Sequence, residues 1–228
     1  MPNKVYYSDD WVTIYHGDNR DVSVEQCDHL ITDPPYSAVT HKGARTGSGQ
    51  DVLLENKFSE TTSDAIRGML LRFSPRRWSL FFGDHYTVAP ISLDPPSHLE
   101  FIRWMVWVKP NGAPQFTGDR PATGLEHIAL LHPPGKKEWN GGGKHGVYTC
   151  NQAANPHHPT VKPQKLMLQL VSDFTDNGET VIDPFMGIGS TLLACKTLGR
   201  KCIGIELEEK YCEVAAKRLS QDYFDFDQ

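Results

Sequence analysis

The segment DPPY places a carboxylate, two prolines and an aromatic ring directly after the apolar run HLIT (29–32). Pro35 has no N–H, and its ring pushes Pro34 into an extended conformation. The carboxylate of Asp33 and the carbonyl of Pro34 are therefore two hydrogen-bond acceptors on a stiff mount. Tyr36 adds an aromatic ring. The segment is therefore either a site of chemistry at the end of a strand or an ordinary proline turn.

A second candidate site follows the strand-like run ETVIDPF (179–185). Gly187 and Gly189 would let a ligand approach the backbone between this strand and the next helix. Glu206 ends the following strand, about twenty residues further on, the spacing at which a carboxylate accepts the hydroxyls of a ribose. Leu192 stands where a dinucleotide fingerprint has its third glycine, which disfavours a pyrophosphate loop. A plain βα turn with a surface glutamate is the alternative.

The elements that must position these groups alternate between strand-like and helix-like patterns. Apolar runs that end in an acid, Gly or Pro are typical of buried parallel strands. Strands are expected over 11–18, 28–36, 76–84, 100–110, 124–134, 179–185 and 201–207. Helices are expected over 63–73, 162–175, 191–199 and 209–220, the first with Ser63 as its N-cap. The last two strands and helices form a βαβα unit.

The length of 228 residues favours one large α/β domain over 1–228. Five cysteines without a CxxC pair favour reduced, buried thiols. No window is apolar enough for a membrane span and no signal peptide is evident, so a soluble cytoplasmic protein is expected. The formal net charge of −5 gives no overall attraction to nucleic acid, which then requires a local basic patch. Candidate patches are Lys42 with Arg45, Arg76 with Arg77, and Lys136 and Lys137 with Lys144.

Three motifs together resemble the S-adenosylmethionine-dependent amino-methyltransferases of DNA: DPPY (33–36), HPTVKP (158–163) and DPFMGIGST (183–191). The resemblance extends from about Val12 to Leu219, and the order of the motifs resembles the circularly permuted β class. It implies a Rossmann-like fold with a mostly parallel, doubly wound sheet. It also implies S-adenosylmethionine as cofactor and double-stranded DNA as partner. No metal site is expected, because the spacing of the histidines and cysteines matches no zinc pattern.

The resemblance also implies how the DPPY segment works. An exocyclic amine is a poor nucleophile because its lone pair is delocalised into the base, so Asp33 and the Pro34 carbonyl would accept its N–H groups. Tyr36 would stack on the target base, which must be flipped out of the duplex at a cost of a few kcal/mol. Asp rather than Ser before PPY favours N6 of adenine. The alternatives are N4 of cytosine and a non-catalytic DNA-binding partner subunit.

The resemblance assigns the adenosine part of the cofactor to two acids. Asp18 resembles the residue that accepts the adenine amine, and an ordinary strand-end cap is the alternative. Glu206 resembles the residue that accepts the ribose hydroxyls. Further cofactor contacts are implied for Asp33, Gly187, Gly189, Ser190 and Thr191.

The resemblance assigns the methionine part of the cofactor to the other motif residues. Thr160 and Lys162 resemble residues that contact this moiety, and Lys162 could face its carboxylate. Asp183 and Phe185 would lie around the amine and the sulfonium, where a carboxylate and an aromatic face suit positive charge.

Two segments are expected to meet the DNA. The loop 37–60, with Lys42 and Arg45, would be mobile and close over the flipped nucleotide. The segment 110–157 would be a short target-recognition region, interrupted by a strand. Such a short region predicts a short target sequence, help from a second subunit in a homodimer, or loose specificity. Its candidate phosphate contacts are Lys136, Lys137 and Lys144, with a solvated charge run as the alternative.

Other chemical residues are interpreted as structural. The segment LDPPSH (93–98) repeats Asp-Pro-Pro but has no aromatic residue next and no clear strand before it, so it predicts a turn. His157 and His158 with Cys150 match no zinc spacing. Core packing is expected for Trp78, Trp104 and Trp107.

Overall fold

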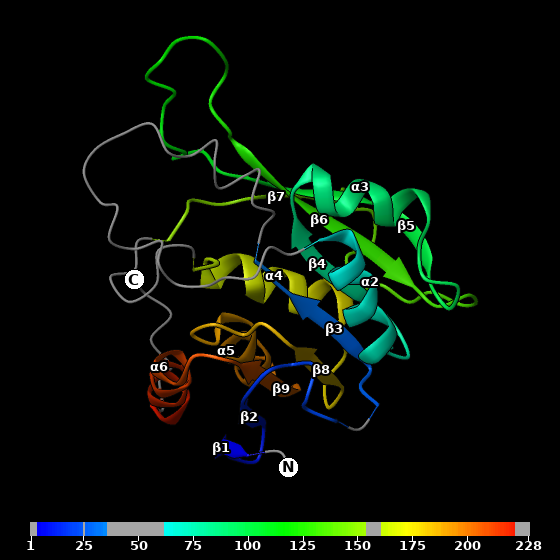
Figure 1. Cartoon of the computed structure of the whole chain (residues 1–228), viewed down its shortest axis with the longest axis vertical. Helices are drawn as coiled ribbons and strands as arrows, with labels where there is room; N and C mark the ends of the chain where they lie inside the picture. The colour runs from blue at the N-terminus through cyan, green and yellow to red at the C-terminus, as the bar shows by residue number, and fades with distance from the viewer. Residues whose placement is uncertain (1–3, 25, 36–61, 154–160, 222–228) are drawn as a thin grey trace.

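The computed structural model describes residues 4–24, 26–35, 62–153 and 161–221 (Figure 1). The expected loop 37–60 lies outside these residues, as do Tyr36, Lys42, Arg45 and Thr160. The strands are β1 (Val5–Ser8), β2 (Val12–His16), β3 (His29–Thr32), β4 (Ser79–Gly83), β5 (Glu100–Val108), β6 (Leu125–His132), β7 (Val147–Thr149), β8 (Thr180–Asp183) and β9 (Lys201–Glu206). The helices are α2 (Ser63–Arg72), α3 (His85–Leu93), α4 (Gln164–Phe174), α5 (Ser190–Thr197) and α6 (Glu209–Ser220).

All nine strands of the described residues belong to one sheet, in the order β1-β2-β9-β8-β3-β4-β6-β5-β7. β2, β9, β8, β3 and β4 run parallel to one another, and β7 runs parallel to β5. β1 is antiparallel to β2, and β6 is antiparallel to both β4 and β5. The expected α/β fold with a mostly parallel sheet is confirmed.

The strand directions divide the sheet into two edges. We call the edge at which the parallel strands end the carboxyl edge, and the other the amino edge. β6 begins at the carboxyl edge, because His127 near its start pairs with Gly83 at the end of β4. β6 therefore ends at the amino edge, and in Figure 1 its arrow points away from the direction of β3. In parallel α/β sheets, ligands bind at the carboxyl edge.

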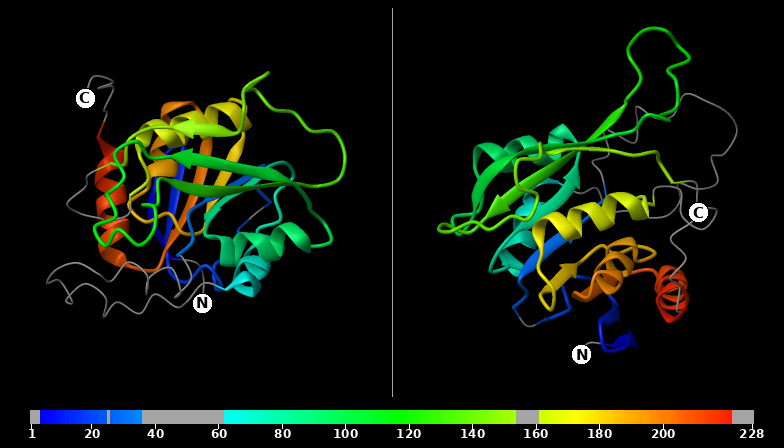
Figure 2. Two further views of the ribbon diagram at one scale, coloured as in Figure 1. Left: turned by 90° about the horizontal axis from the view of Figure 1, so that it is seen from above. Right: turned by 180° about the vertical axis from the view of Figure 1, so that it is seen from behind.

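Helices cover both faces of the sheet, with α4 and α5 on one face and α2 and α3 on the other (Figure 2). Side chains alternate between these faces along each strand. Leu80 and Phe82 of β4 belong to the core beneath α4, α5 and α6, whereas Phe81 packs with α2 and α3. This two-sided burial explains why the central strands are apolar throughout instead of alternating with polar residues.

Some elements differ from the sequence-based expectation. Thr62, not Ser63, is the N-cap of α2, because its Oγ1 accepts a hydrogen bond from the Ala65 N–H at 3.2 Å. The elements β1, α3 and β7 are absent from that expectation. β7 has only three residues, and α3 contains Pro90, so neither gives a continuous periodic pattern.

Most of the residues expected in the core are buried. Trp78 and Trp107 are buried, and all five cysteines are buried, reduced thiols, as expected. Trp104 is 37% exposed, so the expectation of core packing is wrong for this residue. Its ring lies edge-on against Phe101 and His127. Among the described residues, we find no helix of the length and apolar character that a membrane crossing requires.

Candidate active site

Asp33 follows directly after β3, between the ends of β8 and β4. Its Oδ2 accepts a hydrogen bond from Lys162 Nζ at 2.5 Å. Its Oδ1 is buried and has no hydrogen-bond partner within the described part of the chain. Burial raises the pKa of the Asp33 carboxyl, and the Lys162 cation opposes that shift. Buried polar atoms are nearly always paired, so an orphaned acceptor at a strand end indicates a place for a ligand's donor.

Lys162 belongs to a chain of alternating charges. Its Nζ lies 3.3 Å from Glu126 Oε2, and Glu126 Oε1 accepts a hydrogen bond from Lys109 Nζ at 3.1 Å. The same ammonium lies 4.7 Å from the centroid of the Phe82 ring. Burial lowers the pKa of Lys162, but the charges of Asp33 and Glu126 outweigh it, so the net shift is upward and the side chain stays cationic. In this row of ion pairs, the charges of Lys109 and Lys162 balance those of Glu126 and Asp33.

The glycine loop between β8 and α5 has a backbone that only glycine adopts readily. Gly187 has a φ of 51° and Gly189 a φ of 77°, both in the left-handed region. A Cβ on Gly189 would lie 3.1 Å from the Cβ of Ala215 on α6. The loop therefore presents backbone instead of side chains next to the start of α5, as expected for a site where a ligand approaches closely.

Asp183, the last residue of β8, is buried beside Asp33. Its Oδ1 accepts hydrogen bonds from Thr32 Oγ1 at 2.6 Å and from the Phe185 N–H at 3.1 Å, and Thr191 also donates to the carboxylate. Burial nevertheless raises its pKa to about 6. A buried carboxylate with a raised pKa is poised to receive a cation.

Glu206 and Asp18 end adjacent strands. Glu206 accepts hydrogen bonds from the Gly187 N–H at 3.0 Å and from the Glu208 N–H at 2.8 Å, so it is tied to the glycine loop. Asp18 pairs with the exposed side chain of Arg20 at 2.5 Å, and this contact lowers the pKa of Asp18. Burial raises the pKa of Glu206. Both side chains offer carboxyl oxygens to hydroxyl or amine donors at the carboxyl edge.

The carboxyl edge thus brings together residues that are far apart in the sequence. It fits a ligand that carries a ribose, an ammonium group and a sulfonium, because backbone, carboxylates and one aromatic ring surround the same strand ends. The predicted residues that the structure places there are Asp18, Asp33, Pro34, Pro35, Lys162, Asp183, Phe185, Gly187, Gly189, Ser190, Thr191 and Glu206.

The three lysines predicted to contact phosphates lie at the amino edge, because β6 runs antiparallel and carries the chain away from Asp33. Each pairs with a carboxylate: Lys136 with Glu138 at 2.6 Å, Lys137 with Glu100 at 2.8 Å and Lys144 with Asp173 at 2.7 Å. They therefore lie at the opposite edge of the sheet from Asp33, and contact with DNA phosphates stays a prediction for them. The candidate patch of Arg76 and Arg77 also lies at the amino edge, in ion pairs with Asp28, Glu138, Asp176 and Glu179.

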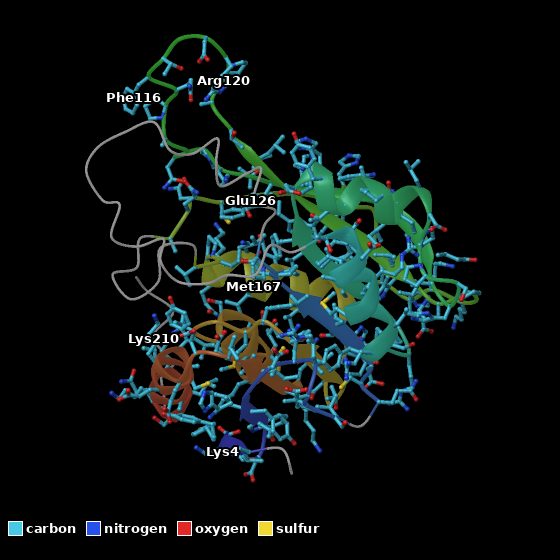
Figure 3. All side chains as sticks on the ribbon, in the orientation of Figure 1. Lys4, Phe116, Arg120, Glu126, Met167 and Lys210 are labelled. Atoms are coloured by element: carbon cyan, nitrogen blue, oxygen red, sulfur yellow. The ribbon has the colours of Figure 1, made fainter. Side chains whose placement is uncertain are left out.

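Two charged residues of the site, Lys109 and Glu126, are missing from the sequence-based prediction. They flank the segment 110–124, at the end of β5 and the start of β6 (Figure 3). The sequence signal that could have found them is a charged residue at the end of an otherwise apolar strand, Lys109 after β5 and Glu126 near the start of β6. Only the antiparallel pairing of β5 with β6 shows that both charges face the same place.

Known proteins resemble this chain over most of its length. A family model described as DNA methylase, N6_N4_Mtase, matches residues 27–217. The type II methyltransferase M.HpaI of Haemophilus parainfluenzae is 26% identical over 91% of this chain and 73% of its own length. The type II methyltransferase M2.LlaDCHI of Lactococcus lactis subsp. cremoris is 26% identical over 97% of this chain and 94% of its own.

Solved structures also resemble this chain over most of its length. The M1.HpyAVI–SAM complex aligns with a TM-score of 0.70 and 25% identity, over 92% of this chain and all of that one. The cytosine-N4-specific PvuII DNA methyltransferase aligns with a TM-score of 0.71 over 98% of this chain and 91% of its own, and at 14% identity it shows the shared fold alone. The carboxyl-edge geometry and the family match lead to one conclusion: the chain belongs to the N6/N4 family of DNA methylases and is a DNA methyltransferase that uses S-adenosylmethionine.

Proposed function

We propose that the protein methylates N6 of an adenine that is flipped out of double-stranded DNA. The observation that carries this proposal is the buried Oδ1 of Asp33 beside Pro34, which has no hydrogen-bond partner among the described residues. Oδ1 accepts one N–H of the adenine amine and the Pro34 carbonyl accepts the other, which makes the nitrogen lone pair available. Burial raises the pKa of Asp33 and so makes its carboxylate a stronger acceptor. Tyr36 provides the stacking surface for the flipped base.

S-adenosylmethionine supplies an electrophilic methyl group on a positively charged sulfur, so the chain's own task is to bind and orient. Asp18 receives the adenine amine of the cofactor, and Glu206 receives the ribose hydroxyls. Asp183 and Phe185 line the methionine ammonium and the sulfonium, and Thr160 is a further candidate for contact with the methionine moiety. Gly187 and Gly189 give the glycine loop its left-handed turn, and the close packing of Gly189 against Ala215 holds this loop beside α6.

The DNA contacts belong to the carboxyl edge. The segment 110–124 leaves the sheet there and projects from the body, with Phe116 and Arg120 at its far end (Figure 3). Phe116 is 87% exposed, which suits an aromatic side chain that packs against bases. We therefore restrict the proposed target-recognition region to 110–124 and to the residues from 150 onward. Lys42 and Arg45 remain candidates for phosphate contacts in the loop 37–60.

The motif order supports assignment to the β class, since Asp33 precedes the glycine loop along the chain. Cytosine N4 is the second candidate target, because its exocyclic amine poses the same chemical problem. Asp at position 33 favours adenine by the habit of this family. A short recognition segment also favours a homodimer in which the second subunit adds contacts.

The deciding experiment identifies the product. The purified protein is incubated with S-adenosylmethionine and unmethylated genomic DNA, and the DNA is digested to nucleosides for mass spectrometry. N6-methyl-2′-deoxyadenosine as the methylated nucleoside is expected. N4-methyl-2′-deoxycytidine would overturn the choice of base, and cofactor binding without any methylated nucleoside would favour a non-catalytic DNA-binding subunit. Sequencing that detects methylated bases then gives the target sequence.

A further inference from the structure

We infer that Glu126 is a positioning residue for methyl transfer: through Lys162 it holds Asp33 with Oδ2 occupied and Oδ1 directed to the target amine. The inference rests on the proposed function, because it concerns the same carboxylate. No sequence motif includes Glu126, which lies near the start of β6, at the base of the projecting segment (Figure 3). Its place in the site follows from tertiary contacts alone.

The first step concerns the two oxygens of Asp33, which have different surroundings. Oδ2 is bound by Lys162 at 2.5 Å, whereas Oδ1 has no partner within the described residues. A carboxylate with one oxygen fixed has one oxygen left for the substrate, and its plane is set by the fixed bond. Lys162 thus selects which oxygen of Asp33 is open to the amine.

The second step concerns Lys162, which is itself held from three sides. Asp33 and Glu126 accept from its ammonium, and the Phe82 ring lies against it. Lys162 precedes α4 by two residues and is buried, so its side chain has little freedom. Glu126 is fixed in turn by Lys109 at 3.1 Å. Fixed supporting contacts of this kind decide whether a reacting group stands within the narrow range of productive geometry.

The third step concerns charge. Lys109 and Lys162 carry two positive charges, which Glu126 and Asp33 balance. If Glu126 were neutral, the positive charge of Lys162 would act on Asp33 without the opposing charge of Glu126, and the Asp33 carboxylate would be a weaker base. The charged groups around Asp33 are Lys162 before α4, Glu126 on β6 and Asp183 on β8.

These contacts also reassign Lys162. The resemblance implies that this lysine faces the methionine carboxylate of the cofactor. In the structure it already bridges two carboxylates of the chain, and a third would compete with them. We therefore infer that Lys162 orients Asp33 and does not bind the methionine carboxylate of the cofactor. Kinetic measurements distinguish these two roles. Loss of a cofactor contact raises KM for S-adenosylmethionine, whereas loss of a positioning contact lowers kcat.

The test is Glu126→Gln in the full-length protein, which keeps the shape and removes the charge. We expect kcat to fall about 10- to 100-fold, the size of effect that a small misplacement of a reacting group produces. KM for S-adenosylmethionine should change less than threefold. The acid limb of the kcat–pH profile should move to lower pH, because the negative charge of Glu126 helps to raise the pKa of Asp33. Glu126→Asp, which restores the charge, should move the limb back.

Glu100→Gln is the matched control, since Glu100 lies on the neighbouring strand β5 and pairs with Lys137 at the amino edge. It should leave kcat and its pH profile unchanged. A purely structural role of Glu126 would reduce the fraction of folded enzyme without moving the profile. An unchanged profile with kcat within twofold of wild type overturns the inference, as does a large rise in KM with kcat retained.

A second readout does not depend on activity. The Asp33 carboxyl carbon is titrated by NMR in the protein without DNA, in wild type and in Glu126→Gln. The midpoint should be lower in the variant, and an equal midpoint overturns the inference. If wild type transfers no methyl group to DNA, the proposed function fails, while this titration still decides whether Glu126 acts on Asp33.

Discussion

The sequence contains Asp-Pro-Pro twice, and the two copies have different fates. Asp33 follows the central strand β3, with one carboxylate oxygen on a buried lysine and the other buried without a partner in the part of the chain that the structure describes. Asp94 caps the end of α3, where its side chain is 84% exposed and pairs with Arg67 at 2.9 Å. The residues after it form a turn, closed by a hydrogen bond from the Leu99 N–H to the Pro96 carbonyl at 2.8 Å. The predicted turn at this second copy is confirmed.

The difference shows that Asp-Pro-Pro supplies a stiff backbone in both places. The surrounding residues determine whether that backbone holds a reactive carboxylate or forms only a turn. An exposed ion pair such as that of Asp94 contributes about 0–1 kcal/mol to stability, because water solvates both charges almost as well. In the pair of Asp33 with Lys162, the lysine is buried and the aspartate is partly buried, so removal of one partner leaves a poorly solvated charge. The cost reaches about 3–5 kcal/mol where both partners are fully buried. Asp33 therefore has a strong influence on its neighbours, and Asp94 has little.

The strongest test of the difference between Asp33 and Asp94 is to make the same substitution at both positions. Asp33→Asn should lower the rate of methyl transfer about 100- to 10,000-fold, because the amide is a weaker acceptor and no base. Asp94→Asn should leave the rate within twofold. Single-turnover methylation with radiolabelled cofactor measures both. Similar rates in the two variants would remove Asp33 from the chemistry.

A second pair contrasts two exposed apolar side chains. Phe116 in the segment 110–124 and Leu93 at the end of α3 are each 87% exposed. Phe116→Ala should weaken DNA binding about 5- to 100-fold, since stacking of a base on an aromatic ring contributes about 1–3 kcal/mol. Leu93→Ala should bind DNA as wild type does, as measured by fluorescence anisotropy at fixed salt. Equal affinities would exclude Phe116 from the interface.

A third prediction concerns pH. The pKa of Asp183 is raised to about 6, so its carboxylate is charged above that pH and neutral below it. Affinity for S-adenosylmethionine should fall by up to about tenfold per pH unit as the pH drops through 6, because the attraction to the cofactor's cations is lost. Calorimetric titrations between pH 5 and 8 would measure it. Asp183→Asn should bind weakly throughout this range, and a wild-type-like pH dependence in the variant would place the titrating group elsewhere.

The smallest effect is expected from the glycine loop. Gly189 and Gly178 have φ angles of 77° and 82°, so alanine should cost about 1–2 kcal/mol of stability at either position. Only at Gly189 does the new Cβ also meet a neighbour, Ala215 at 3.1 Å. Gly189→Ala should therefore weaken cofactor binding and Gly178→Ala should not. Denaturant unfolding and calorimetry separate the two effects, and equal cofactor affinities would contradict a role for the loop backbone.

Much of this site could be predicted from local sequence. DPPY, the glycine loop and Glu206 each follow a strand whose apolar run is visible in the chain, and parallel strands necessarily end at one edge. That is why Asp33, Asp183, Gly187 and Glu206 were predicted as neighbours although the sequence separates them. Helix boundaries were harder, as the shift of the α2 cap to Thr62 shows.

The direction of β6 could not be predicted from the sequence, and it determines which charged residues lie near Asp33. An apolar run has the same composition whichever way the strand runs, so LEHIALLH says nothing about which end meets the site. Antiparallel pairing with β4 and β5 sends Lys136 and Lys137 to the amino edge and brings Glu126 to Lys162. The sequence by itself determined the chemistry of the strand ends, because it depends on residue type. Only the tertiary structure decided which charges surround that chemistry, because strand direction is set by neighbouring strands.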